Sequence, residues 1–325
     1  MTLSADMQLQ LGSFRLAAKI TAPGNAITVL FGPSGSGKST LLSILAGLRP
    51  ADDDDIRLND HRLSGLPPHQ RGLGLVFQDA RLFPHLTVRQ NIAYAWSRAP
   101  REKRPGIEAV AKFFDIDKQL DRPVTNLSGG EKSRVALARA VAAAPDFLLL
   151  DEPFAALDGA RRRAFIQVLM DMHRNYHLPM IVVTHNIDDA AALASHLVAL
   201  KEGKVVAQGT FTDASRAPQF QALLDSADVG TAMPPSSLRS SHGGQSLWIR
   251  ADQVLLAAEE PRAVSARNVL AGEVRAVTAQ DDGSRLVELE TERGPVLSRI
   301  TPEAARDLGL ERGKKAWALV KAHAL

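Results

Sequence analysis

The 325-residue sequence contains no cysteine, which excludes disulfides, thiolate metal sites and a cysteine nucleophile. Aromatic residues make up only 5% and the formal net charge is only +3. Both values argue against a nucleic-acid-binding surface, which needs stacking side chains and an excess of cations. No apolar run approaches the roughly 18 residues of a membrane span, and the first residues lack the pattern of a signal peptide. We therefore expect a soluble, cytoplasmic protein without a nucleic-acid partner, whose membrane role would pass through another protein.

The remaining composition is that of a globular protein, with 45% hydrophobic and 23% charged residues, and the length predicts two domains. Four short apolar runs predict buried parallel strands, because strands covered on both faces are continuously apolar. They span residues 26–31, 74–77, 147–150 and 180–183. Helices are expected between them at 39–48, 131–143, 160–175 and 187–197. This alternation predicts a doubly wound α/β sheet.

The composition changes near Val229. Residues 229–246 are rich in Pro, Ser and Gly, which is typical of a linker. Beyond them, turn residues separate short alternating segments at 247–256, 268–278, 285–291, 296–300 and 315–322, which predict a small all-β barrel. The expected organisation is an α/β domain at 1–228, a linker at 229–246 and an OB-like barrel domain at 247–325.

A glycine-rich loop follows the first predicted strand and precedes a helix. Its pattern, Gly-x-x-x-x-Gly-Lys-Ser, is that of a phosphate-binding loop, in which backbone N–H groups and the helix N-terminus surround phosphate. Lys38 would reach the β- and γ-phosphates and Ser39 would bind Mg²⁺, whereas a chance glycine-rich turn is the plain alternative. The expected nucleotide-binding residues here are Gly32, Pro33, Ser34, Gly35, Ser36, Gly37, Lys38, Ser39 and Thr40.

The other three predicted strands also end in reactive side chains, and ligands of open parallel sheets bind at that edge. Asp151 ends the third strand and is an expected Mg²⁺ partner, and Glu152 would polarise the attacking water. His185 follows the fourth strand and would contact the γ-phosphate or the water. Gln78 follows the second strand and would bind Mg²⁺ or sense it. Each of these residues also has an interpretation without a function. Asp151 and Glu152 would be an acidic pair at the start of a helix, His185 would be a structural histidine, and Gln78 would be a loop amide.

The segment Leu127-Ser128-Gly129-Gly130-Glu131 predicts a helix start. Ser128 and Glu131 have the spacing of a capping box, which explains the helix without any function. The capping box does not explain Gly129 and Gly130, whose exposed amides would form a second anion site. Two phosphate-facing sites for one nucleotide suggest that one of them serves the ATP of a neighbouring subunit.

Residues 1–225 resemble the ATPases of ATP-binding-cassette (ABC) transporters, on the motifs GPSGSGKST, Gln78, LSGGE, FLLLDEP, Ala156-Leu157-Asp158 and His185. The resemblance implies a P-loop NTPase fold with a RecA-like core and a helical subdomain. It also implies a homodimer enclosing ATP and Mg²⁺, with Ser128 and Gly130 facing the partner's γ-phosphate. Glu152 would be the catalytic carboxylate, with Lys38 and His185 beside it, and Asp158 would communicate across the dimer.

The same resemblance implies partners. Residues 79–95 would receive a membrane permease subunit, an external solute-binding protein would complete the system, and the chain would lie peripherally on the cytoplasmic face of the inner membrane. Members of the family usually stack an aromatic side chain on adenine. Phe14 is the candidate here, although a core position explains it at least as well.

Residues 262–325 resemble the molybdate-binding (Mop/TOBE-like) barrel, on the segment Ser265 to Val274 and on residues 299–301, 308–310 and 318–322. The whole chain is thus similar to the ATPase subunits of molybdate importers. A tetrahedral dianion needs hydrogen-bond donors, and the expected ones are Ser265, Arg267, Asn268 and Lys321. These residues would otherwise only build the barrel and its dimer contacts. Importers of this kind often carry a longer first part of the barrel, whereas the segment 229–246 is short.

Three other functions compete with molybdate import. The cargo would be sulfate, a polyamine or a sugar if the barrel is only structural, but the Ser265–Asn268 segment favours molybdate. A soluble ABC ATPase of repair or translation would carry a long coiled-coil insertion or two fused cassettes, and neither is present. A non-enzymatic oxyanion store would not need Lys38, Asp151, Glu152 and His185.

Overall fold

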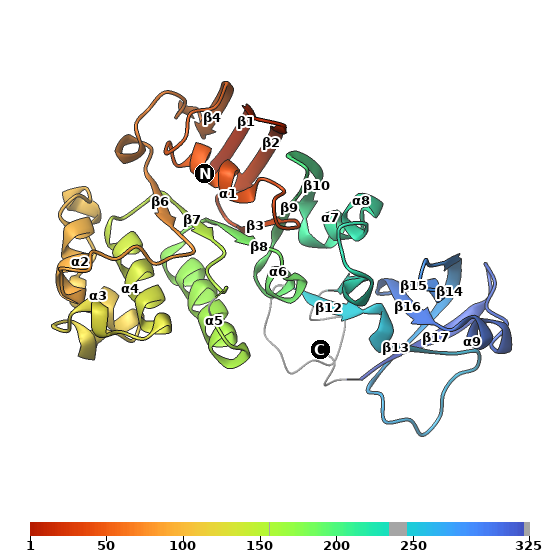
Figure 1. Cartoon of the computed structure of the whole chain (residues 1–325). Helices are drawn as coiled ribbons and strands as arrows, with labels where there is room; N and C mark the ends of the chain where they lie inside the picture. The colour runs from red at the N-terminus through yellow and green to blue at the C-terminus, as the bar shows by residue number, and fades with distance from the viewer. Residues whose placement is uncertain (156, 234–245, 322–325) are drawn as a thin grey trace. The chain divides into compact units, whose positions relative to one another are not determined.

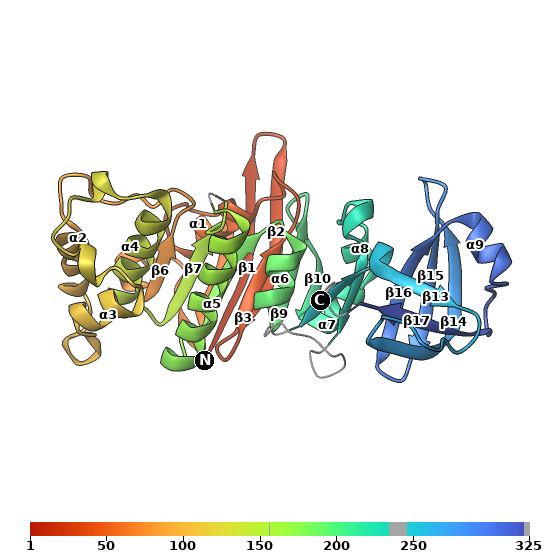
Figure 2. The same ribbon diagram turned by 90° about the horizontal axis from the view of Figure 1, so that it is seen from below.

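The computed structural model describes residues 1–155, 157–233 and 246–321. Contacts group the chain into two compact units (Figures 1 and 2). Unit 1 comprises Met1–His185 and Val198–Gln208, and unit 2 comprises Asn186–Leu197 and Gly209–Leu325. The expected boundary after residue 228 therefore falls inside unit 2. In the described ranges, no helix is both long and apolar enough to cross a membrane.

The four predicted parallel strands are confirmed. They are β3 (Ile27–Phe31), β6 (Leu73–Val76), β7 (Phe147–Asp151) and β8 (Met180–Thr184). They lie side by side in the order β3-β8-β7-β6. Phe31 pairs with Thr184 and Asp151 with Val183, so the segments that follow these strands leave the sheet at the same edge. That edge is where an open α/β sheet binds its ligands.

The same sheet also contains six strands that the sequence analysis did not predict. They are β1 (Thr2–Leu11), β2 (Phe14–Pro23), β4 (Asp53–Leu58), β5 (His61–Arg62), β9 (His196–Lys201) and β10 (Lys204–Thr210). Among the described residues the full order is β5-β4-β1-β2-β10-β9-β3-β8-β7-β6. β1 and β2 are antiparallel, and alternate residues such as Leu3, Met7 and Leu16 are buried in the core. The sheet is therefore mixed, with an antiparallel part beside the parallel one.

The predicted helices of the ATPase part are present with shifted ends. They are α1 (Lys38–Leu45), α4 (Gly129–Ala142), α5 (Gly159–Tyr176) and α6 (Ile187–Leu193). The prediction of a helix up to residue 197 is wrong, because the chain turns at Ala194 and His196 begins β9. Two further helices, α2 (Val88–Trp96) and α3 (Ile107–Phe113), gather with α4 beside β6 (Figures 1 and 2). Short 3₁₀ turns lie at Pro68–Gln70, Arg101–Lys103, Asp117–Gln119, Val124–Asn126, Ser226–Asp228 and Ala251–Gln253.

Buried Arg71 holds the end of the helix that follows the phosphate-binding loop. Its Nη1 donates to the carbonyl oxygens of Ile44 and Leu45 at 2.8 Å, and its Nε donates to Leu66 O at 2.9 Å. These carbonyls lie in the last turn of α1, where Ile44 O also accepts from Gly47 N at 3.0 Å, and a cation there complements the helix dipole. Burial lowers the pKa of Arg71, and Asp54 partly opposes this shift.

Unit 2 contains the predicted small β domain. Its five-stranded sheet has the order β13-β17-β14-β15-β16. The strands are β13 (Val254–Ala257), β14 (Asn268–Ala279), β15 (Arg285–Thr291), β16 (Gly294–Ile300) and β17 (Lys315–Val320), with helix α9 (Pro302–Asp307) before the last. The Ser298 hydroxyl on β16 donates to the Val254 carbonyl on β13 at 2.6 Å. This contact joins the two end strands and gives the sheet its barrel-like closure.

The expected linker is partly a strand. Gly230–Met233 form β11, which pairs with β12 (Leu247–Arg250) and is buried, because its apolar side chains pack into unit 2. Residues 234–245 lie outside the described residues. The single segment expected at 247–256 is in fact two strands, because the turn at 251–253 separates β12 from β13.

The part of unit 2 that precedes the barrel packs on β12. Trp248 lies edge-on to Phe211 of α7 (Phe211–Arg216) and Phe220 of α8 (Pro218–Gln221). Arg250 forms ion pairs with Asp188 at 2.8 Å and Asp228 at 3.1 Å. A fragment starting at residue 229 would therefore lose these partners of β12, although it would keep β11.

Candidate functional site

The phosphate-binding loop connects β3 to α1 and requires glycine at two points. A Cβ on Gly37 would meet the Phe14 ring at 2.8 Å, and the φ of Gly37 is +101°. A Cβ on Gly32 would clash with the Leu200 carbonyl oxygen. The loop is thus closed on its core side, and only backbone without side chains fits there. Phe14 itself is partly buried against the core, and this packing accounts for it without a bound adenine.

Lys38 is the first residue of α1 and is only 4% exposed. Its Nζ donates to the carbonyl oxygens of Gly32 and Pro33, both at 2.8 Å. Burial lowers the pKa of Lys38, while the charges of Glu152 and Asp151 oppose the shift. The ammonium is therefore held at the mouth of its own loop, where a phosphate would be a stronger partner than two neutral carbonyls.

Ser39 and Asp151 lie side by side in the structure, although they are 112 residues apart in the sequence. The Ser39 hydroxyl donates to Asp151 Oδ1 at 2.9 Å. Burial raises the pKa of Asp151, and the hydrogen bond from Ser39 opposes this shift. A hydroxyl and a half-buried carboxylate are hard oxygen ligands. Mg²⁺ prefers such ligands, and substrate phosphates complete its coordination shell. The residues present therefore fit a magnesium ion.

Glu152 lies one residue beyond β7 in a backbone conformation that is uncommon for a side-chain-bearing residue, with φ +44°. Its Oε1 lies 3.4 Å from Nδ1 of His185, which follows β8. The Glu152 side chain is 21% exposed and that of His185 56%. The structure thus brings these two expected residues together at the edge where the phosphate-binding loop begins. Gln78, after β6, is exposed at the same end of its strand.

The Ser128 segment has the expected capping box. Ser128 N donates to Glu131 Oε2 at 2.7 Å, and Glu131 N donates to Ser128 Oγ at 3.3 Å. Hydrogen bonds to the Glu131 carboxylate, first from the backbone of Ser128 and then from its side chain, lower the pKa of Glu131. Besides accepting from this amide, the Ser128 hydroxyl carries a proton of its own that it can donate to an acceptor.

The two glycines leave the start of α4 open. A Cβ on Gly129 would meet nothing within 4 Å, and one on Gly130 would only reach Leu157. A pocket adjoins the loop and is lined in part by Ser128, Gly130, Arg134 and Arg161. The helix start therefore has room for an anion beside it. Asp158, expected to act across a dimer, caps α5 by accepting from Arg161 N at 3.0 Å, whereas Ala156 lies outside the described residues.

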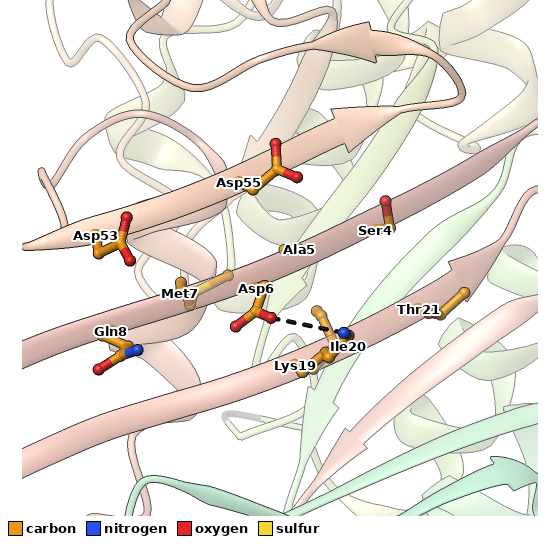
Figure 3. Close-up of a pocket in the computed structure, with 10 residues that line it drawn as sticks. All are labelled: Ser4, Ala5, Asp6, Met7, Gln8, Lys19, Ile20, Thr21, Asp53 and Asp55. Carbon is orange, nitrogen blue, oxygen red and sulfur yellow. Dashed lines mark ion pairs between the residues drawn. The ribbon is translucent and has the colours of Figure 1, made fainter.

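A second hollow lies on the outward face of β1, β2 and β4 (Figure 3). Asp6 is paired with Lys19 on one side, at 3.7 Å, and lies directly across from Asp55 on the other. Asp55 in turn forms ion pairs with Arg57 and Arg62. None of the residues expected to bind nucleotide or oxyanion lines this hollow, which is an ion-paired, solvent-exposed sheet face.

Three of the four expected oxyanion residues, Arg267, Asn268 and Lys321, lie at one end of the barrel. Asn268 pairs with Val320, so Arg267 and Lys321 flank the same end of the β14–β17 pair. Ser265, Arg267 and Lys321 are exposed, whereas Asn268 is only 4% exposed. The structure thus brings Arg267, Asn268 and Lys321 to one end of the strand pair but buries Asn268, which is less accessible than Arg267 and Lys321.

Two arginines near the nucleotide edge were missed by the sequence analysis. Arg81 lies with its guanidinium 3.8 Å from the Phe77 ring centroid, and its charge partly opposes the rise that burial causes in the pKa of Asp151. Arg139 binds the backbone just after Gln78. The signal for Arg139 was present, since it is a lone charge in the apolar second half of α4, where a buried cation needs a specific partner.

Comparison with known proteins identifies the family. The ABC transporter family pattern matches residues 17–155, and the TOBE domain pattern matches residues 264–325. A molybdenum import ATP-binding protein (ModC) of Methylococcus capsulatus is 36% identical over 99% of both chains. One from Azotobacter vinelandii (ModC 1) is 37% identical over 99% of this chain and 98% of its own. The chain belongs to the ABC transporter ATP-binding proteins.

Solved structures agree with this assignment. A dimeric ATP-binding cassette in a post-hydrolysis state, bound to ADP and Pi, matches with a TM-score of 0.57 and 26% identity, covering 65% of this chain and 98% of that one. The cbiO1 subunit of a Clostridium perfringens ABC transporter matches with a TM-score of 0.59 and 24% identity, covering 68% of this chain and 92% of its own. This ABC ATPase therefore has the P-loop fold that the sequence predicted, and it binds nucleotide through that fold.

Proposed function

We propose that this ABC ATPase powers a molybdate importer, as the peripheral subunit on the cytoplasmic face of the inner membrane. The observation that carries the proposal is the full-length match to molybdenum import ATP-binding proteins, which includes the barrel as well as the ATPase part. The same names favour molybdate over sulfate, a polyamine or a sugar as cargo.

The arrangement of Lys38, Glu152 and His185 supports hydrolysis. When ATP binds, the Lys38 ammonium exchanges two neutral carbonyl partners for the β- and γ-phosphates. Its positive charge then pairs with the negative charge of the phosphate oxygens. Glu152 accepts a proton from the attacking water, and His185, 3.4 Å away, orients that carboxylate and faces the γ-phosphate. Ser39, Asp151 and Gln78 would hold Mg²⁺, which neutralises phosphate charge when bound.

A second copy of the chain completes the site. In the proposed homodimer, Ser128 donates its hydroxyl proton to the partner's γ-phosphate, and the Gly129 and Gly130 amides add the positive end of the α4 dipole. The glycines and the adjoining pocket leave space for this approach. Each ATP is then held between the phosphate-binding loop of one copy and the Ser128 segment of the other.

The membrane subunits would bind the segment 79–95, and an external solute-binding protein would deliver the cargo. This segment contains all of α2 except its last residue. It has an aromatic surface, in which the Phe83 ring lies edge-on to the Tyr94 ring with centroids 4.6 Å apart, and Tyr94 is 43% exposed. Buried Asn91 holds Phe83 by accepting from its N at 2.9 Å and donating to its carbonyl oxygen at 3.2 Å. A permease segment would therefore meet a fixed surface.

Transport itself is the test. The chain, assembled with its membrane subunits in vesicles that enclose ATP and Mg²⁺, should accumulate molybdate delivered by the solute-binding protein. Uptake should stop when ATP is replaced by ADP, because the driving force is hydrolysis. Excess sulfate outside should leave the uptake rate unchanged. Equal uptake of sulfate and molybdate, or uptake without ATP, would refute the proposed cargo or the proposed driving force.

Molybdate on the nucleotide side should lower the ATPase rate of the assembled transporter. An oxyanion bound by Ser265, Arg267 and Lys321 changes turnover only if it binds one arrangement of the two subunits more tightly than the other. Arg267→Ala should remove the inhibition and keep the basal rate, and Arg306→Ala, at an exposed arginine of α9, should leave the inhibition intact. The measurement is ATPase rate against added molybdate, with sulfate as the control anion. A flat response in the unmodified protein would make the barrel purely structural.

A further inference from the structure

Arg139 forms a two-pronged contact with the chain just after Gln78. Its Nη1 donates to Arg81 O at 2.9 Å, and its Nη2 donates to Ala80 O at 3.2 Å. The guanidinium carbon also lies 5.2 Å from the centroid of the Phe83 ring. Arg139 is half-buried, and its guanidinium is held by these neutral oxygens and the ring face. Burial lowers the pKa of Arg139, and Tyr94 opposes this shift.

The segment that Arg139 holds is under local strain. Arg81 has φ +43°, a left-handed conformation that costs free energy for a residue with a side chain. It persists because the surroundings fix it: Arg81 stacks on Phe77 at 3.8 Å, and Asn91 binds both backbone groups of Phe83. Gln78 lies between Phe77 and the two clamped carbonyls, so its backbone position depends on this clamp.

The same helix carries Ser128 at its other end. Ser128 caps the N-terminus of α4, and Arg139 lies eleven residues further on, about 16 Å along a rigid helix. The buried face of α4, from Val135 to Ala138, holds the helix in the core between these ends. A displacement of Ser128 along the helix axis is therefore transmitted to the carbonyls of Ala80 and Arg81.

We propose that Arg139 is a positioning residue, which keeps Gln78 and Ser128 in a fixed register through helix α4. This inference rests on the proposed function, in which Gln78 serves the copy's own ATP and Ser128 serves that of its partner. One arginine then adjusts both active sites of the dimer together, although it touches neither nucleotide.

Arg139→Lys tests the clamp. Lysine keeps the charge and most of the stem, but its ammonium lacks the planar fork that holds two carbonyls at once. Thermal unfolding and ATP binding should stay near those of the unmodified protein. The kcat should fall about 10- to 100-fold, since a displacement of roughly 1 Å costs that much, and KM for ATP should change little. Arg104→Lys is the matched control, because Arg104 also donates to two carbonyls, those of Ala99 and Ser97, and stacks on Trp96, remote from Gln78.

Mixed dimers test separately whether Arg139 affects the site through Gln78 and whether it affects the site through Ser128. Mixing Lys38→Ala with a chain carrying Arg139→Lys and Ser128→Arg leaves one intact site. This site uses Gln78 of the chain that carries Arg139→Lys. Mixing Ser128→Arg with a chain carrying Arg139→Lys and Lys38→Ala leaves one intact site. This site uses Ser128 of the chain that carries Arg139→Lys. We expect both mixtures to hydrolyse ATP about 10-fold or more slowly than the same mixture with Arg139 unchanged.

The outcomes are distinct. Slower hydrolysis in both mixtures supports the shared register. A loss in only one of them means that Arg139 serves a single end, which overturns the proposal. Unchanged kcat of Arg139→Lys also overturns it, and leaves the proposed function standing. No activity in the mixture with Arg139 unchanged would instead remove the shared site of the proposed function, and this inference with it.

Discussion

Glu152→Gln should abolish turnover while leaving ATP bound. The amide cannot accept a proton from water, and loss of a general base lowers the rate by about 10²- to 10⁴-fold. Among the described residues, the Glu152 side chain lies 3.4 Å from His185, and it acts on Lys38 of the phosphate-binding loop only through its charge. ATP affinity should therefore be near that of the unmodified protein, and the ATP-bound dimer should accumulate because its next step is blocked.

Equilibrium ATP binding, steady-state phosphate release and size-exclusion chromatography with ATP measure the three expectations. Lys38→Ala is the contrasting variant. It removes a charged hydrogen-bond donor to phosphate, which costs roughly 1.5–3 kcal/mol, about 10- to 100-fold in affinity. Glu102→Gln, at an exposed carboxylate of a 3₁₀ turn, should change neither ATP affinity nor the rate of phosphate release. Near-normal phosphate release by Glu152→Gln would show that the catalytic carboxylate is another residue.

Two inactive variants should regain activity when they are mixed. Lys38→Ala disables the phosphate-binding loop, and Ser128→Arg fills the space beside Gly129 and Gly130 that the partner's phosphate needs. In a heterodimer, one site combines both defects and the other combines neither. Random pairing in a two-fold dimer should then give about a quarter of the unmodified activity.

A chain that carries both changes is the matched control. Mixed with Lys38→Ala, it leaves no intact site in any pairing, so the mixture should stay inactive. ATPase rate after mixing equimolar chains is the measurement. Activity in the control mixture, or none in the test mixture, would contradict sites shared between two copies.

Local sequence determined much of the ATPase site. The strands before Gly32, Gln78, Asp151 and His185 were predictable because they are short, continuously apolar and end in polar residues. The capping box at Ser128 was predictable for the same reason, since both of its partners lie within one helical turn. These features depend on a few neighbouring residues and on the register of adjacent parallel strands.

Contacts between distant residues were not predictable in this way. Arg139 and the Arg81 carbonyl are 58 residues apart, and no local pattern in either segment specifies the pairing. β1 and β2 alternate apolar and polar residues, and this period-2 signal, weaker than a continuous apolar run, was overlooked. β11 lies in a Pro- and Gly-rich stretch, and its pairing with β12 rather than its composition makes it a strand.

The most direct measurement is the specific ATPase activity of the isolated chain as its concentration is varied with ATP and Mg²⁺ in excess. If each site needs the phosphate-binding loop of one copy and Ser128 of another, activity per chain should be near zero when the copies are dilute. It should rise with concentration to a plateau, and Glu152→Gln should stay inactive throughout. Activity per chain that is constant from dilute to concentrated solution, with sedimentation showing monomers at the dilute end, would contradict the shared site.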